Sequence, residues 1–195
     1  MQTLYENLPQ LLLPWYRTHA RKLPWRRDQE PYHVWLSEIM LQQTRVEAVK
    51  RYYTRFLAAL PTIEALALAP EDQLTKLWEG LGYYNRVRNL QKAAIQIMED
   101  YGGVMPDSYE ELLKLKGIGS YTAGAVSSIA YGKPNPVADG NVLRVIARVR
   151  KDERCISEDK VKKAVEKDLW EVIPTDRPGD FNQAMMEFGA CVCIP

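Results

Sequence analysis

Hydrophobic residues recur at helical spacing along almost the whole chain, whereas strand-like alternation bounded by turns is almost absent. The pattern is clearest over residues 83–101, where one helical face collects Val87, Leu90, Ala94, Ile97 and Met98. Glycine and proline divide the pattern into segments of helix length: Pro61 stops one segment, and Gly102-Gly103 ends another. The chain is therefore predicted to be all-α.

These boundaries predict helices over residues 4–16, 31–43, 45–60, 62–68, 71–80, 83–101, 108–115, 120–131, 142–150, 158–170 and 179–189. The Pro-rich residues 133–136 break the pattern and favour two lobes. We expect one lobe over 23–133, with a helix-hairpin-helix at about 108–131, and a second made of 1–22 and 134–195. The cleft between two such lobes is where we expect the active site.

Composition argues against a membrane or secreted protein but does not indicate a binding partner. The 195 residues hold no apolar run near the roughly 20 that a membrane helix needs, and their start makes a poor secretion signal. We therefore expect a soluble, cytoplasmic protein that makes no membrane contact. A net charge of +1 permits DNA binding without indicating it, since basic clusters such as residues 144–154 could equally be solvated helix faces.

A glycine hairpin over residues 115–124 is the first candidate site. Gly117 and Gly119 permit positive φ and close backbone approach, and Ser120 suits the N-cap of the helix that follows. Free N–H groups and the positive end of that helix dipole would bind a phosphate without any lysine. The alternative is an ordinary corner between two helices, but the full Leu-x-Gly-Ile-Gly-x-Tyr-Thr-Ala-Gly string favours the functional interpretation.

Two acids are candidates for chemistry. Glu38 lies in an otherwise apolar helical stretch, which favours a cleft-facing acid with a raised pKa, although a solvent-facing acid fits the periodicity equally well. Asp139 precedes Gly140 at the start of a helix, so it is either a plain N-cap or a carboxylate kept ionised to face positive charge. A protonated acid paired with an ionised one is the usual arrangement for hydrolysing glycosidic bonds.

Six segments, in order along the chain, resemble MutY-type adenine DNA glycosylases, which belong to the helix-hairpin-helix, endonuclease III-like base-excision superfamily. They are Leu-Pro-Trp-Arg (23–26), Ser-Glu-Ile-Met-Leu-Gln-Gln-Thr (37–44), Gly-Leu-Gly-Tyr-Tyr (80–84), the hairpin, Val-Ala-Asp-Gly-Asn-Val (137–142) and Phe-Asn-Gln-Ala-Met-Met-Glu-Phe-Gly-Ala (181–190). The resemblance implies excision of adenine mispaired with 8-oxoguanine or guanine in double-stranded DNA.

By this resemblance Glu38 would protonate adenine at N7, Asp139 would stabilise the oxocarbenium-like sugar, and Asn141 would orient that carboxylate and the water. The positions that match the pocket around the flipped adenine are Trp25, Arg26, Leu41 and Gln183. Gln43 and Tyr83 match residues that probe or wedge the base stack. The other positions expected to contact DNA are Gln42, Thr44, Leu81, Gly117, Gly119, Ser120 and Tyr121.

Tyr121 separates this chain from its lyase relatives. Lyases that resemble endonuclease III carry a lysine there, which forms a Schiff base, and a tyrosine cannot; the resemblance therefore implies a monofunctional glycosylase, with Tyr121 stacking near the lesion pair. Two alternatives remain open. One is a related glycosylase acting on T:G, U:G or oxidised pyrimidines, and the other is a DNA-binding fragment without turnover.

The cysteines are Cys155, Cys191 and Cys193, an odd, sparse set that argues against a disulfide framework. The resemblance implies a [4Fe–4S] cluster on four cysteines, of which Cys193 matches the first. The other three ligands would lie beyond Pro195, so we expect a monomeric catalytic fragment truncated at the start of the iron–sulfur loop. Cys155 and Cys191 are interpreted as small core residues.

Overall fold

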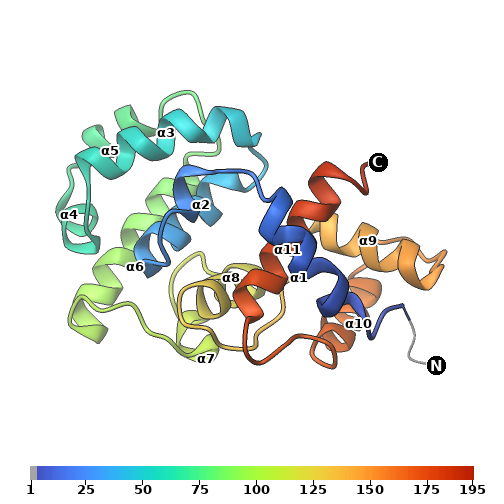
Figure 1. Ribbon diagram of the computed structural model, residues 1–195. Coiled ribbons are helices and arrows are strands. Elements are labelled where there is room, and N and C mark those ends of the chain that lie inside the picture. The colour runs from blue at the N-terminus through green and yellow to red at the C-terminus, as the bar shows by residue number, and fades with distance from the viewer. Residues whose placement is uncertain (1–3) are drawn as a thin grey trace. The chain divides into compact units, whose positions relative to one another are not determined.

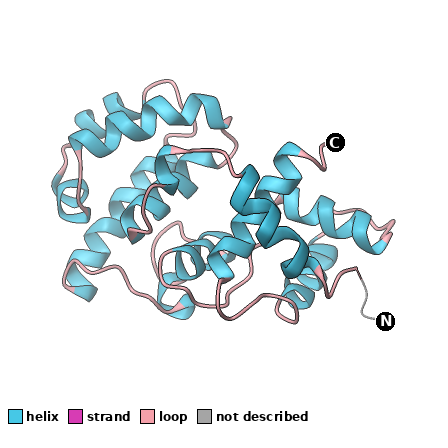
Figure 2. Cartoon of the chain, in the orientation of Figure 1, coloured by secondary structure: helices cyan, strands magenta, loops and turns pink. Residues whose placement is uncertain are grey.

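Every regular element of the computed structural model, which describes residues 4–195, is a helix (Figures 1 and 2). The elements are α1 (Leu8–His19), the 3-10 helix η1 (Pro24–Arg26), α2 (Pro31–Leu41), α3 (Val46–Ala59), α4 (Ile63–Leu68), α5 (Glu71–Trp78), α6 (Asn85–Tyr101), α7 (Tyr109–Leu112), α8 (Ser120–Ile129), α9 (Gly140–Arg150), α10 (Asp159–Leu169) and α11 (Pro178–Cys191). The predicted all-α class is confirmed. Within the described range, no helix is both long and apolar enough to span a bilayer.

The chain divides into two compact units. The terminal unit combines the residues up to Arg21 with Ser127–Pro195, and the central unit is Lys22–Val126. The division falls inside α8, whereas the sequence pattern placed it in the Pro-rich segment after residue 133. The end of α8 belongs to the terminal unit because Ser127 accepts a hydrogen bond from Asn135 (2.9 Å) and Ser128 accepts one from Asn182 (2.8 Å).

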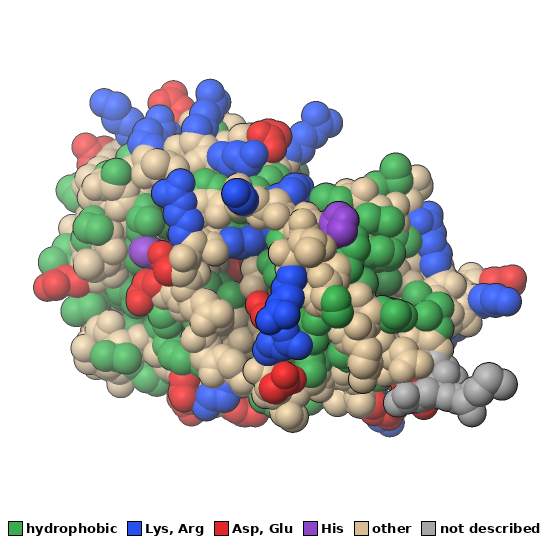
Figure 3. Space-filling view, viewed as in Figure 1, with side chains coloured by type: hydrophobic (Ala, Val, Ile, Leu, Met, Phe, Trp, Pro, Cys, Tyr) green, Lys and Arg blue, Asp and Glu red, His purple; other side chains and the backbone are tan. Residues whose placement is uncertain are grey.

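Helix α2 is the buried centre of the central unit, where it packs against α3 and α6. A helix that is apolar on every side is stable only when neighbours cover it. The buried residues of α2 are Tyr32, Val34, Trp35, Leu36, Ser37, Glu38, Ile39 and Met40. The outer face of α3 is solvated instead, and Lys and Arg side chains gather over it (Figure 3), among them the exposed Arg51 and Arg55.

The core of the terminal unit forms where α11 packs against both α1 and α9. Its apolar centre includes Leu12, Leu13, Val142, Ile146 and Phe181. An ion pair between a half-buried arginine and a buried glutamate lies beside this centre. Glu187, with a fully buried side chain, accepts hydrogen bonds from Arg21 Nε (2.7 Å), Nη2 (2.8 Å) and the Arg21 backbone N–H (2.9 Å). This bidentate contact ties the end of the N-terminal segment to α11.

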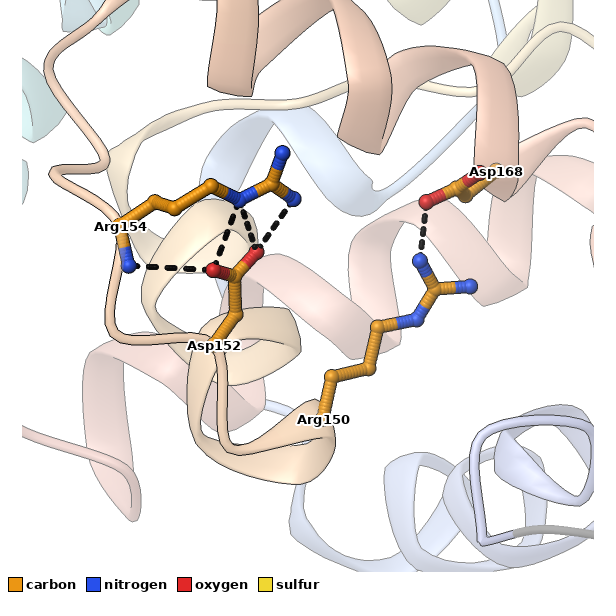
Figure 4. Close-up of polar contacts among 4 residues, drawn as sticks. All are labelled: Arg150, Asp152, Arg154 and Asp168. Atoms are coloured by element: carbon orange, nitrogen blue, oxygen red, sulfur yellow. Dashed lines mark hydrogen bonds and ion pairs between the residues drawn. The ribbon is translucent and has the colours of Figure 1, made fainter.

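The basic residues near the end of α9 are exposed, and two of them form ion pairs within the terminal unit. Arg150 pairs with Asp168 of α10, and Arg154 pairs with Asp152 (Figure 4). Hydrogen bonds from Arg154 lower the pKa of the Asp152 carboxyl to about 2. Both arginines are exposed, so the solvated-face interpretation of residues 144–154 holds for them, with an acidic partner for each.

Arg21→Ala should lower the free energy of unfolding by about 3 kcal/mol, since it leaves the buried Glu187 carboxylate without its main counter-charge. The matched control is Arg17→Ala on the exposed end of α1, which should change it by less than about 0.5 kcal/mol. Urea denaturation followed by circular dichroism measures both. An equal loss of unfolding free energy in the two variants would show that the Arg21–Glu187 pair does not stabilise the protein more than an exposed arginine does.

Candidate functional site

Glu38 is a buried acid on α2, with only 7% of its surface exposed. Its Oε2 accepts a hydrogen bond of 2.7 Å from the Tyr121 hydroxyl on α8. The solvent-facing alternative for Glu38 is therefore wrong, because the helix turns this position toward the interior of the central unit. Stacking of Tyr121 near the lesion pair stays a prediction, and its hydroxyl contacts the Glu38 carboxyl.

Asp139 caps α9, and both of its carboxylate oxygens are held by donors. Oδ1 accepts the backbone N–H of Val142 (2.8 Å), and Oδ2 accepts the Asn141 side-chain amide (2.7 Å). The residue is partly buried with extended backbone, φ −86° and ψ 177°. Donors on both oxygens therefore fix the orientation of the carboxylate at the N-terminus of α9. Asp139 is therefore an N-cap, and the same geometry suits a carboxylate that faces positive charge.

Arg144 fixes the amide of Asn141, and motif reasoning did not single it out. Its Nη2 donates to Asn141 Oδ1 (3.0 Å) and to the Gly189 carbonyl (2.7 Å), while its Nε donates to the Cys193 carbonyl (2.8 Å). The amide of Asn141 is therefore bonded on both sides, to Arg144 and to Asp139. A charged residue one helical turn after Asn141 was the available signal, since i and i+3 positions share a helix face.

Asn182 holds the loop that leads to Asp139, and it too was missed. Its amide donates to Ser128 Oγ (2.8 Å) and to the Asn135 carbonyl (2.8 Å), and its oxygen accepts the Val137 N–H (3.3 Å). Asn182 is 2% exposed. Gln183, the next residue on α11, is partly exposed.

Three of the predicted adenine-pocket residues belong to the central unit, where η1 packs against α2 and α3. Trp25 of η1 is 7% exposed and meets Tyr53 edge to face, with ring centroids 5.6 Å apart. Arg26 ends η1, and Leu41 ends α2. The structure therefore brings η1 to the helix that carries Glu38. Gln183 lies in the terminal unit.

The residues expected to probe the base stack occupy two short loops of the central unit. Gln43 and Tyr83 are exposed, and each has a left-handed backbone, with φ of 55° and 51°. Such φ values are rare outside glycine and concentrate at functional sites. Leu81, in the second loop, is 7% exposed, so its side chain packs inside the unit.

The hairpin differs from its prediction in three details. Only Gly117 has a positive φ, 78°, where an added Cβ would lie 2.8 Å from Asn89 Cβ. Ser120 is the first residue of α8 rather than its N-cap, because the Gly119 carbonyl already accepts the Ala123 N–H (2.9 Å). The helix that precedes the hairpin is also short, Tyr109–Leu112, since residues 113–116 continue as turns.

The expected cluster ligand, Cys193, lies beside a cation. Its Sγ is 3.2 Å from Arg148 Nη1. Nowhere in residues 4–195 do three His, Cys, Asp or Glu side chains gather as a metal site would require. These residues therefore do not fit a [4Fe–4S] cluster, which needs four thiolates. Cys155 and Cys191 are both exposed, so their interpretation as core residues is wrong.

The hairpin and the capped aspartate follow one another along the chain as in helix-hairpin-helix DNA repair proteins, and this defines the class. The family model of the HhH-GPD superfamily base excision DNA repair proteins matches residues 36–175, and the chain belongs to this family. The predicted superfamily is confirmed.

Similar curated proteins in this family include adenine DNA glycosylases. The human adenine DNA glycosylase is 47% identical over 197 residues, covering 94% of this chain and 35% of that protein. The adenine DNA glycosylase of Buchnera aphidicola subsp. Baizongia pistaciae is 41% identical over 190 residues, covering 95% of this chain and 52% of that protein. The chain thus spans about a third to a half of the length of these relatives.

Two solved structures share the fold. A thermostable thymine-DNA glycosylase superposes with a TM-score of 0.84 at 28% identity, over 98% of this chain and 88% of that chain. Endonuclease III in a trapped covalent intermediate with DNA superposes with a TM-score of 0.82 at 25% identity, over 100% of this chain and 90% of that chain.

Gly189→Ala should destabilise the terminal unit by about 2 kcal/mol, because the new Cβ would lie 2.6 Å from Asn141 Cβ and 2.9 Å from the Asn141 carbonyl oxygen. Gly140→Ala is the control one residue before Asn141, where no atom lies within 4 Å, and it should be nearly neutral. Thermal melting of both variants checks this. Equal melting temperatures would mean that α11 does not need the close approach.

Proposed function

We propose that this protein is a monofunctional adenine DNA glycosylase, which hydrolyses the N-glycosidic bond of adenine mispaired with 8-oxoguanine or guanine in duplex DNA and acts as a monomer. The observation that carries the proposal is the pair of differently placed carboxyls, Glu38 buried against a hydroxyl and Asp139 held by two N–H donors. Relatives named adenine DNA glycosylase, 41–47% identical over 94–95% of this chain, support the choice of base.

The proposed reaction divides the work between the two acids. Glu38 gives its proton to adenine N7, which makes the base a better leaving group. As the bond breaks, positive charge develops on the sugar, and the ionised Asp139 stabilises it. Water then adds to the sugar and gives a proton to the Glu38 carboxylate, which leaves an abasic site and restores the acid. Asn141 and Arg144 keep the Asp139 carboxylate in one orientation throughout, so little reorganisation is needed at the moment of reaction.

Base binding is proposed for the positions that match the family pocket: Trp25, Arg26, Leu41 and Gln183. Contact with the DNA is proposed for the residues of two loops and the hairpin: Gln42, Gln43, Thr44, Leu81, Tyr83, Gly117, Gly119, Ser120 and Tyr121. The N-terminus of α8 offers backbone N–H groups to a phosphate. Extruding a base costs a few kcal/mol, which the contacts of the pocket and the loops would offset.

The absence of strand cleavage is proposed from Tyr121. A lyase needs an amine that attacks the sugar to form an imine, and a phenol provides none. The Tyr121 hydroxyl is instead engaged with Glu38.

Thymine excision is the second candidate, because a thermostable thymine-DNA glycosylase superposes over 98% of the chain. A single-turnover assay on A:8-oxoguanine, A:G, T:G and thymine glycol duplexes separates the candidates. Alkali-dependent cleavage at adenine, with no adduct trapped by borohydride, is the expected result. Cleavage at thymine, or a trapped adduct, would contradict the proposal, and binding without any abasic product would indicate a module without turnover.

Glu38→Gln should reduce the single-turnover rate of adenine excision by about 10²-fold or more, because an amide cannot donate the proton. Asp139→Asn should cause a similar loss by removing the charge that faces the sugar, while keeping a cap for α9. Binding to the A:8-oxoguanine duplex, measured by fluorescence anisotropy, should persist in both variants. Full excision activity in Glu38→Gln would refute its role as general acid.

Tyr121→Phe should slow excision by about 3- to 10-fold, the usual effect of one hydrogen bond, because the Glu38 carboxyl loses one orienting donor. Tyr101→Phe is the matched control, since the Tyr101 hydroxyl donates to Glu111 at the same distance, 2.7 Å, elsewhere in the central unit. Comparing the two rates at saturating protein isolates the contact with Glu38. A similar rate for both variants would remove Tyr121 from the mechanism.

A further inference from the structure

Arg86, near the start of α6, joins the end of α2 to the loop that precedes α6. Its Nη1 donates to the carbonyls of Ile39 (2.9 Å), Met40 (3.1 Å) and Gln42. Its Nη2 donates to Thr44 Oγ1 (3.2 Å) and to the carbonyls of Leu81 (3.2 Å) and Gly82 (3.3 Å). The last carbonyls of a helix have no partner within the helix, and one guanidinium satisfies several of them here.

The guanidinium is enclosed by two aromatic rings. It lies 5.5 Å from the ring centroid of Trp78 and 5.5 Å from that of Tyr83. Trp78, which is fully buried, also donates its indole N–H to the Gly82 carbonyl (3.1 Å). Arg86 borders a small cavity of about 40 Å³ that Trp35 and the hairpin residue Gly117 also line. Burial lowers the pKa of Arg86 below its ordinary value.

Each of the two loops that Arg86 joins contains one left-handed residue. Among residues 4–195, non-glycine residues with positive φ are Gln43, Tyr83 and Lys151, and the first two lie in these loops. A left-handed backbone costs about 1–3 kcal/mol and persists only where the surroundings impose it. The bonds of Arg86 hold the residues on either side of Gln43 and those directly before Tyr83. Both side chains then point into solvent, with Tyr83 64% exposed.

We infer that Arg86 is a positioning residue for recognition of the mispair: it locks the two loops together so that Gln43 and Tyr83 meet the DNA as one rigid pair. This inference rests on the proposed function, because it assumes that these loops engage a mispaired duplex. Lysine cannot replace Arg86, since an ammonium ion lacks the planar fork that reaches both loops. The measurable consequence is selectivity for the mispair, rather than binding to DNA in general.

The test measures dissociation constants for an A:8-oxoguanine duplex and a matched A:T duplex, in a Glu38→Gln background that leaves the substrate intact. Arg86→Lys should lower the selectivity ratio by about tenfold, in the range that one lost base contact causes. Arg88→Lys is the control on the same helix, because its surface pair with Glu71 (3.1 Å) is far less enclosed, and it should leave the ratio unchanged.

A double-mutant cycle distinguishes positioning from a role in stability alone. The comparison is repeated in proteins that already carry Gln43→Ala and Tyr83→Ser. If Arg86 acts through these two residues, adding Arg86→Lys to that background should change the selectivity ratio by less than about twofold. A lower melting temperature with unchanged selectivity would overturn the inference. An equal loss of selectivity in both backgrounds would also overturn it.

If Arg86→Lys does not fold, Trp78→Phe decides the matter, because this buried residue supports Gly82 without reaching DNA. Reduced selectivity in Trp78→Phe supports the inference, and unchanged selectivity overturns it. Adenine excision by the wild-type protein is measured alongside. Absence of adenine excision by the wild-type protein would refute the proposed function. The double-mutant cycle, which measures binding selectivity, would still test the role of Arg86.

Discussion

The cost of burying polar groups among packed helices is the constraint on which this structure depends. Glu38, Asn182 and Glu187 are each at least nine-tenths buried, and a side chain in such a place is stable only when its hydrogen-bonding atoms are matched. Tyr121, Ser128 and Arg21 supply those partners. The same bonds that offset desolvation also fix orientation, and a fixed carboxyl is what acid catalysis requires. Stability and proposed chemistry therefore rely on the same contacts.

The two units use this constraint differently. In the central unit, α2 is buried on every side, so Glu38 is held by the packing of a whole helix. In the terminal unit, Asp139 lies at a helix end, where backbone and amide N–H groups hold it in a partly open position. One carboxyl is thereby enclosed, and the other is held by N–H donors on both oxygens. These are the environments that hydrolysis of a glycosidic bond asks of its two acids.

Charge alone would not have identified a DNA repair protein. The net charge is +1, and Arg21, Arg86, Arg144 and Arg150 are all engaged within the protein. A helix N-terminus and a hairpin backbone can bind phosphate without side-chain cations. The arginines instead organise the structure, because a guanidinium can satisfy several carbonyls or a whole carboxylate at once.

Short-range spacing is what the sequence by itself determined. Helical periodicity predicted the all-α class, and Asp139 could be identified as a cap because its partners are residues 141 and 142, within one helical turn. Only the tertiary structure decided the long-range partners. Tyr121 and Glu38 are 83 positions apart, and Arg86 lies 47 positions from Ile39. No local pattern encodes such a pair, because packing of several helices selects which side chains meet.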